Sequence, residues 1–263
     1  MEKICVITGG TSGIGKHTAE MMTQKGYTVY ELSRRAEGLP GMLHIPTDVT
    51  DSVACQRAID EIVSQAGKIN VLINNAGFGI SGAVEFTPIE QAKRQLDVNF
   101  FGMVNMNHAA LPVMRKQGFG RIVNLSSVAG AIPIPFQAFY SASKAAVNSY
   151  TMALANETRL FGVQVCCIQP GDIRTGFTDA RQKIMAGDDI YNGRISRSVS
   201  RMEKDERGGM TPEAAGAFIC RVAIKKSVKP INTIGLSYQI FCVLQKLLPA
   251  KAVNWLVGLI YAK

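Results

Sequence analysis

The first 26 residues of the chain combine an apolar run, a glycine-rich turn and a helix-forming stretch. Residues 3–8 read KICVIT, which is typical of a buried strand, and the turn GGTSGIG follows at residues 9–15. Residues 16–25 favour a helix that ends at Gly26. A helix that begins at such a turn leaves backbone N–H groups unpaired, and glycines let an anion approach them. The segment therefore predicts a phosphate-binding turn, although a glycine-rich turn by itself is often only a turn.

The rest of the chain alternates between strand-like and helical stretches. The strand-like runs lie near residues 28–32, 43–46, 70–74, 120–126 and 163–169. This alternation predicts a parallel sheet covered by helices on both faces. The sequence shows no linker, repeat or Ser/Pro-rich tract, and 47% of its 263 residues are hydrophobic, which is enough for a large core. We therefore expect a single α/β domain over residues 1–263.

A second group of residues, in the middle of the chain, carries side chains suited to proton transfer. Tyr140 and Lys144 are four residues apart, so on a helix they share one face. A neighbouring ammonium favours the phenolate, so we expect a lowered pKa for Tyr140 and a role in acid/base chemistry. Ser127 ends the predicted strand RIVNLSS at its carboxyl end, where parallel sheets bind ligands. Such pairs also occur on ordinary helix surfaces, but this context predicts a carbonyl/alcohol redox site.

Together these motifs resemble the compact, one-domain form of the short-chain dehydrogenase/reductase family, over residues 3 to about 235. That resemblance implies a Rossmann-type doubly wound parallel sheet and a nicotinamide cofactor. The glycines of this turn are spaced differently from the commoner G-x-G-x-x-G. The residues that carry the resemblance are Thr8, Gly9, Gly13, Ile14, Gly15, Asp48, Asn74, Asn75, Ala76, Gly77, Asn99, Ser127, Tyr140, Lys144, Pro170 and Gly171.

The resemblance also implies a role for each residue. Tyr140 would be the acid/base, and Ser127 would hydrogen-bond the reacting oxygen. Lys144 would bind the nicotinamide ribose and lower the pKa of Tyr140, while Asn99 would hold a water that relays protons to Lys144. The implied cofactor-binding residues are Gly9, Thr11, Ser12, Gly13, Ile14, Gly15, Ser33, Arg34, Asp48, Val49, Asn75, Ala76, Gly77, Tyr140, Lys144, Pro170, Gly171, Ile173 and Thr175.

Some of these residues also have purely structural explanations. Asn99 could cap or bridge a helix, and Asp48 could cap the helix that starts near Asp51. The Pro170-Gly171 pair could be an ordinary strand exit. A single nucleotide groove explains all of these positions at once, whereas the structural explanations require independent coincidences.

The end of the second strand bears on the choice of cofactor. When Gly15 and Gly26 are matched to the pattern of the family, Ser33 stands where NAD users carry an aspartate for the ribose 2′-hydroxyl, and Arg34 follows it. A guanidinium there suits the 2′-phosphate of NADP(H), so NADP(H) is favoured over NAD(H). Two residues oppose this prediction: Ser12 stands where many NADP-using relatives have a basic residue, and Glu31 lies nearby.

The net charge, the cysteines and the histidines bear on the partners, the location and the metal content that we expect for the protein. The net charge of +9 is concentrated between Arg174 and Lys229, which indicates a solvated helical face, an anionic substrate or attraction to acidic lipid. No nucleic-acid motif accompanies it, so we expect no nucleic-acid partner. The start of the chain leaves no room for a signal peptide, so we expect a cytoplasmic protein. We predict buried, reduced thiols for the six cysteines, Cys5, Cys55, Cys166, Cys167, Cys220 and Cys242. We predict no metal site, because the three histidines, His17, His44 and His108, are scattered without ligand spacing.

The last third of the chain bears on the substrate. Residues 176–210 follow Pro170-Gly171 and correspond to the variable substrate lid of the family. Residues 236–263 are apolar but interrupted by polar side chains, which predicts two amphipathic helices and no membrane span. This tail resembles the branch of 17β-hydroxysteroid dehydrogenase-like and lipid ketone reductases. It implies a hydrophobic alcohol or ketone, such as a steroid, bile acid or lipid, and possible peripheral membrane contact, although the helices could equally complete the core or a subunit interface.

These observations predict an NADP(H)-dependent oxidoreductase that interconverts a secondary alcohol and a ketone on a hydrophobic substrate. We expect it to form a homodimer or homotetramer. One alternative is a catalytically silent nucleotide-binding regulatory or scaffold protein, which the presence of Asn99, Ser127, Tyr140 and Lys144 disfavours. Another alternative is a related isomerase or dehydratase that uses bound cofactor transiently.

Overall fold

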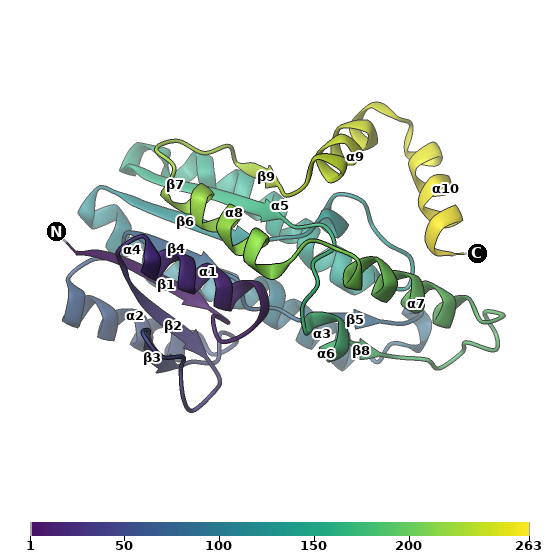
Figure 1. Cartoon of the computed structure of the whole chain (residues 1–263), viewed down its shortest axis with the longest axis horizontal. Coiled ribbons are helices and arrows are strands. Elements are labelled where there is room, and N and C mark those ends of the chain that lie inside the picture. The colour runs from purple at the N-terminus through teal and green to yellow at the C-terminus, as the bar shows by residue number, and fades with distance from the viewer. Residues whose placement is uncertain (1, 263) are drawn as a thin grey trace.

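A computed structural model describes residues 2–262 as a seven-stranded sheet with helices on both faces (Figure 1). The strand order is β3-β2-β1-β4-β6-β7-β9, and every neighbouring pair is parallel. The strands are β1 (Lys3–Thr8), β2 (Tyr27–Ser33), β3 (Leu43–Pro46), β4 (Val71–Asn74), β6 (Gly120–Leu125), β7 (Val163–Gln169) and β9 (Ile231–Thr233). This arrangement confirms the Rossmann-type doubly wound sheet.

The period of two along β1 places its side chains in two separate cores. Ile4 and Val6 join the core beneath α2 (Ser52–Ala66), α4 (Gly102–Gln117) and α5 (Ala138–Thr158). Cys5 and Ile7 join the core beneath α1 (Gly13–Gln24) and α8 (Pro212–Ile224), which pack against each other. A strand buried on both faces is continuously apolar, and this explains the KICVIT run.

The site lies where the strand order reverses. From β1 the chain proceeds outward through β2 and β3, then returns to β4, which pairs with the other side of β1. The connections that leave β1 and β4 therefore separate at their carboxyl ends, and this separation opens the crevice in which doubly wound sheets bind ligands.

The remaining elements connect these strands and helices. They are α3 (Ile89–Leu96), a π-helical turn (Asp97–Phe101), α6 (Phe177–Ala180), α7 (Arg194–Arg207), the 3-10 turns Val84–Phe86, Val128–Gly130 and Arg159–Phe161, and the two-stranded sheet of β5 (Ile80–Ser81) and β8 (Gln182–Lys183).

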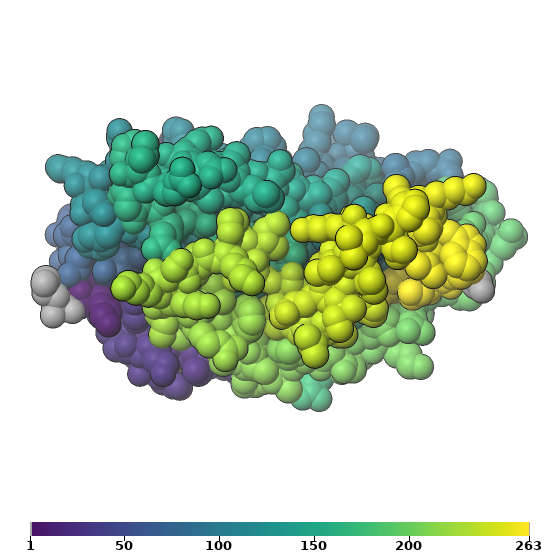
Figure 2. Space-filling model, turned by 90° about the horizontal axis from the view of Figure 1, so that it is seen from above, coloured from purple at the N-terminus to yellow at the C-terminus, as the bar shows by residue number. Residues whose placement is uncertain are grey.

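The two tail helices are α9 (Leu236–Leu247) and α10 (Ala250–Tyr261), as expected. They stand away from the sheet, and α10 contacts α7 (Figure 1). Neither helix contains a buried residue, and Figure 2 shows the tail on the outside of this face of the molecule. Among residues 2–262, no helix is both long and apolar enough to cross a membrane.

The six cysteines are free thiols. Five are buried as expected, whereas Cys242, on the outlying helix α9, is partly exposed, which corrects the prediction for that residue. Burial raises the pKa of Cys55 to about 12, which leaves its thiol protonated and unreactive.

Candidate active site

The glycine turn between β1 and α1 needs its glycines for two different reasons. Gly9 and Gly13 have φ angles of +65° and +52°, a conformation that other residues rarely adopt. At Gly15 the obstacle is space, because a Cβ atom would lie 2.2 Å from the carbonyl oxygen of Gly9. The turn is therefore folded tightly against the start of α1.

The end of β4 fixes this turn in place. Asn75 Nδ2 donates to the carbonyl oxygens of Thr8 and Gly9 at 3.1 and 3.0 Å. In return, Thr8 Oγ1 accepts from the backbone N–H groups of Asn75 and Ala76 at 3.0 and 3.1 Å. Ser12 precedes α1 but its side chain makes no capping bond, so it leaves the N–H groups of the first turn open to a ligand. This cradle fits the pyrophosphate of a dinucleotide.

The far end of the crevice is lined by three of the expected cofactor-binding residues, Arg34, Asp48 and Val49. Arg94, which the sequence did not single out, lines it as well. Although partial burial opposes it, hydrogen bonds from Thr50 and the charges of Arg34 and Arg94 lower the pKa of Asp48. Asp48 does not cap α2, because that position belongs to Asp51, which accepts from the helix backbone.

Glu31 has a structural role in this region. Its side chain is fully buried, and Oε1 accepts from the backbone N–H of Gly10 at 3.0 Å. Oε2 lies 2.6 Å from Nδ1 of His44 and accepts from Ser33 Oγ at 3.3 Å. Both oxygens are engaged, so Glu31 is not a free acidic group for a ribose, while Arg34 beside it is exposed.

Tyr140 and Lys144 lie one turn apart in α5, and both line the crevice. Lys144 Nζ donates to the carbonyl oxygen of Leu125 at 2.7 Å and lies 5.7 Å from the centroid of the Tyr140 ring. Ser127 follows β6, where Val128 N donates to Pro170 O at 2.9 Å. Its hydroxyl forms a hydrogen bond with the phenol of Tyr140. Three elements thus bring the predicted proton donor, cation and hydroxyl together.

The pKa values of this pair differ from the expectation. Burial raises the pKa of Tyr140 to about 12, against the hydrogen bond from Ser127 that lowers it. The negative charges of Glu206 and Asp172 add to the rise. Burial also lowers the pKa of Lys144 to about 8. The expected lowering of the tyrosine pKa is therefore wrong in this structure, because burial and carboxylates outweigh any effect of the ammonium.

Asn99 lies behind the crevice wall, in the π-helical turn. Its Oδ1 accepts from Phe78 N at 3.0 Å, and its Nδ2 donates to Phe78 O and Ser143 Oγ at 2.9 and 3.2 Å. A Cβ atom on Gly77 would lie 3.1 Å from Asn99 Oδ1 and 3.6 Å from Lys144 Nζ, so both side chains approach that glycine. The side chain fixes the loop after β4, and the proton relay stays a prediction.

All the expected cofactor-binding residues, with Ser127 and Tyr140, line one open cleft of about 1350 Å³. The cleft also includes residues that the sequence did not single out. Phe177 of α6 lies 5.8 Å from the Tyr140 ring, centroid to centroid. Asp172 and Tyr238 form a polar pair at the same cleft, and apolar side chains of α9 and α10 extend it beyond them.

A doubly wound sheet with a dinucleotide cradle and a tyrosine–lysine pair at its carboxyl edge defines a nicotinamide-dependent oxidoreductase. A model of the short chain dehydrogenase family matches residues 3–185, and the chain belongs to this family.

Individual relatives match over nearly the whole chain. The 3-ketodihydrosphingosine reductase of Bacteroides thetaiotaomicron is 41% identical over 264 residues, which cover 99% of this chain and 98% of the relative. A short-chain dehydrogenase structure from Streptomyces avermitilis has a TM-score of 0.85 at 26% identity and 97% coverage of both chains. The structure of ElxO with NADP bound has a TM-score of 0.77 at 25% identity, and covers 91% of this chain and 100% of that chain.

Proposed function

We propose that this protein is an NADP(H)-dependent reductase of long-chain lipid ketones. The observation that carries this proposal is the continuity of the cleft, which extends from the glycine turn past Tyr140 to the tail. Its outer part is lined by apolar residues of α9 and α10, namely Phe241, Leu244, Leu248, Val253, Leu256, Val257 and Ile260. A ketone at Tyr140 with a long hydrocarbon chain would place that chain against these residues.

The chain's own residues account for proton delivery. The bound nicotinamide would supply a hydride to the carbonyl carbon. Tyr140 is protonated at neutral pH, because its pKa is raised to about 12, and it would donate its proton to the developing alkoxide. Ser127 would hydrogen-bond the same oxygen, and the Lys144 ammonium beside the phenol would bind the ribose and favour the phenolate left after donation.

Three observations support the preference for NADP(H). Arg34 is exposed at the end of β2, where the ribose of a dinucleotide lies in this fold. Glu31, an acidic side chain near this position, is occupied by Gly10 and His44. The ElxO structure, similar over 91% of this chain, was solved with NADP. A guanidinium holds a 2′-phosphate through charge-assisted hydrogen bonds.

The preference for a lipid is supported by the reductase from Bacteroides thetaiotaomicron, whose name specifies 3-ketodihydrosphingosine. The hydrocarbon chain of this ketone would fill the apolar outer part of the cleft, whereas a rigid steroid or bile acid would not need it. The tail that lines the cleft is the same segment whose apolar pattern resembled the lipid branch of the family.

The proposal is tested with purified protein, NADPH or NADH, and a panel of 3-ketodihydrosphingosine, a steroid ketone and a short aliphatic ketone. Cofactor oxidation is followed by nicotinamide absorbance. We expect the largest kcat/KM for the long-chain ketone with NADPH. Equal rates across the panel would refute the lipid assignment, equal rates with both cofactors would refute the NADP(H) preference, and no turnover would favour the silent alternative.

A further inference from the structure

Asp172 lies in the substrate part of the cleft, two residues after Pro170. Its backbone is fixed, because its carbonyl oxygen accepts from Met210 N at 3.0 Å and its N–H donates to the hydroxyl of Tyr238 at 3.2 Å. The Tyr238 hydroxyl in turn donates to the Asp172 carboxylate. The ring of Tyr238 occupies the space where a side chain on Gly171 would be. The carboxylate therefore has a defined position at the junction of the catalytic and apolar parts of the cleft.

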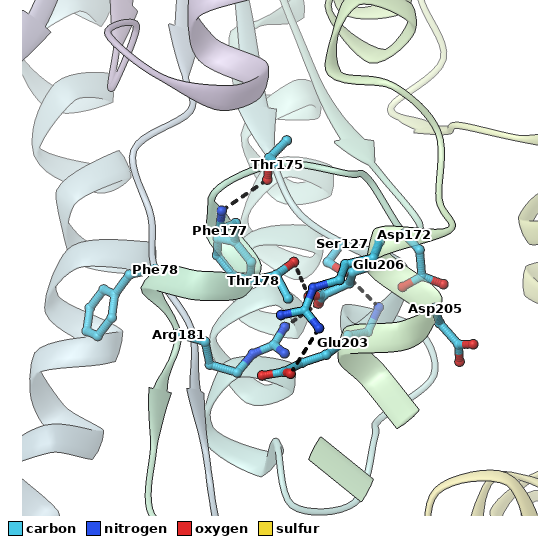
Figure 3. Close-up of polar contacts among 12 residues, drawn as sticks. Phe78, Ser127, Asp172, Thr175, Phe177, Thr178, Arg181, Glu203, Asp205 and Glu206 are labelled. Atoms are coloured by element: carbon cyan, nitrogen blue, oxygen red, sulfur yellow. Dashed lines mark hydrogen bonds and ion pairs between the residues drawn. The ribbon is translucent and has the colours of Figure 1, made fainter. Parts of the chain in front are cut away.

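Asp172 differs from the neighbouring Glu206 and Asp205 because its carboxylate makes no direct ion pair within the described part of the chain. Glu206 pairs with Arg181 and accepts from Thr178 at 2.7 Å, and Asp205 pairs with Arg201 at 2.9 Å. Figure 3 shows Arg181 reaching toward Glu206, with the Asp172 carboxylate on the other side of Glu206 in this view. Within residues 2–262, no lysine or arginine forms an ion pair with Asp172.

An unpaired carboxylate is unfavourable in this place. Burial raises the pKa of Asp172, and the negative charges of Glu206 and Asp205 add to the rise, although the Tyr238 hydroxyl and the positive charge of Arg181 oppose it. Its charge also opposes ionisation of Tyr140 and would oppose an alkoxide at the same site. A cation beside the reacting carbonyl would offset both effects, because it would pair with the carboxylate and stabilise the developing negative oxygen.

Four basic residues at this side of the cleft make their ion pairs with carboxylates other than Asp172. Arg181, Lys183, Arg201 and Arg207 are each paired with acidic residues of α6 or α7. The concentration of positive charge after Arg174 is thus largely structural at this side of the cleft, and an anionic substrate would meet Asp172. A cation that pairs directly with Asp172 would then be supplied by the substrate.

We propose that Asp172, oriented by Tyr238, binds a primary ammonium group carried by the substrate close to its ketone. The substrate class is then a long-chain amino ketone, with its ammonium at Asp172, its carbonyl at Tyr140 and its hydrocarbon chain along α9 and α10. This inference rests on the proposed function and adds a specificity-determining residue to it. The compound 3-ketodihydrosphingosine, a long-chain 2-amino ketone, has this arrangement.

The test compares Asp172→Asn with Asp205→Asn, a matched loss of one carboxylate charge in the neighbouring network but outside the cleft lining. Each variant is assayed with 3-ketodihydrosphingosine and with a ketone of equal chain length that lacks the amine. We expect Asp172→Asn to lower the ratio of kcat/KM for the amino ketone to kcat/KM for the neutral ketone at least ~10-fold, the effect of breaking a close charge pair. Asp205→Asn should leave the ratio between the two substrates unchanged.

Equal losses on both substrates in Asp172→Asn, or the same shift in Asp205→Asn, would overturn the assignment. A measurement on the unaltered protein guards against a variant that fails to fold. With NADPH bound, a long-chain alkylamine should bind at least ~10-fold more tightly than the alcohol of equal length, as followed by thermal stabilisation. Equal binding of amine and alcohol would overturn the role of Asp172. Loss of all ketone turnover with the amine preference intact would instead count against the proposed function.

Discussion

The apolar lining of the tail predicts how catalysis depends on substrate chain length. A fully buried methylene contributes about 0.8 kcal/mol. The lining residues Phe241, Leu244 and Leu256 are 52%, 44% and 43% exposed, so the cleft is open and a chain lying in it would be covered on roughly one side. We therefore expect about 0.4 kcal/mol for each methylene, which is about twofold in kcat/KM. Six added methylenes should raise kcat/KM about 60-fold.

The assay measures initial rates for a homologous series of ketones, below the concentrations at which they form micelles. Leu244→Gln and Leu256→Gln, which alter the lining, should reduce the slope of log kcat/KM against chain length. Leu247→Gln is the matched control, because Leu247 is 75% exposed and does not line the cleft. A flat series in the unaltered protein, or an equal loss of slope in Leu247→Gln, would refute the role of the tail as the chain-binding surface.

Three further predictions concern the catalytic and cofactor residues. Tyr140→Phe should lower kcat at least ~10²-fold, the lower range for general acid catalysis, while NADPH binding measured by fluorescence stays within about twofold. Arg34→Ala should raise the KM for NADPH more than that for NADH, and adding Ser33→Asp should increase the difference by repelling the phosphate; equal losses would place the 2′ site elsewhere. Because burial lowers the pKa of Lys144 to about 8, its ammonium is present below that pH and lost above it. NADPH affinity should therefore weaken as the pH rises through about 8, and Lys144→Met should remove that transition; a transition that persists in the variant would assign it to another group.

Local sequence patterns predicted the parts of this fold that depend on local physics. The five strand-like runs all coincide with strands, because a strand buried on both faces needs a continuous apolar run. The glycine turn was predicted equally well. Gly9 and Gly13 have φ angles that other residues rarely adopt, and a side chain on Gly15 would collide with the backbone of Gly9. The strand β9 and the two-residue strands β5 and β8 were not predicted, because segments of two or three residues carry no measurable periodicity.

The parts of the site that the sequence did not predict depend on residues far apart in the chain. Asp172 and Tyr238 are 66 residues apart, and only the position of α9 brings them together. From the sequence, Glu31 opposed the NADP(H) prediction. In the structure its carboxylate is engaged by the backbone of Gly10 and the ring of His44. The pKa of Tyr140 depends on burial and on charges from several elements. A prediction from Lys144 alone therefore gave the wrong direction for the shift of this pKa.

The most direct test of the central claim follows the transferred hydrogen itself. NADPH carrying deuterium at the transferable position of the nicotinamide is incubated with the protein and 3-ketodihydrosphingosine, and the alcohol is analysed by mass spectrometry. Reduction in this cleft predicts one deuterium at the carbinol carbon of each product molecule, with at least ~10²-fold less labelled product in Tyr140→Phe. Unlabelled alcohol, or undiminished labelling in Tyr140→Phe, would contradict the account.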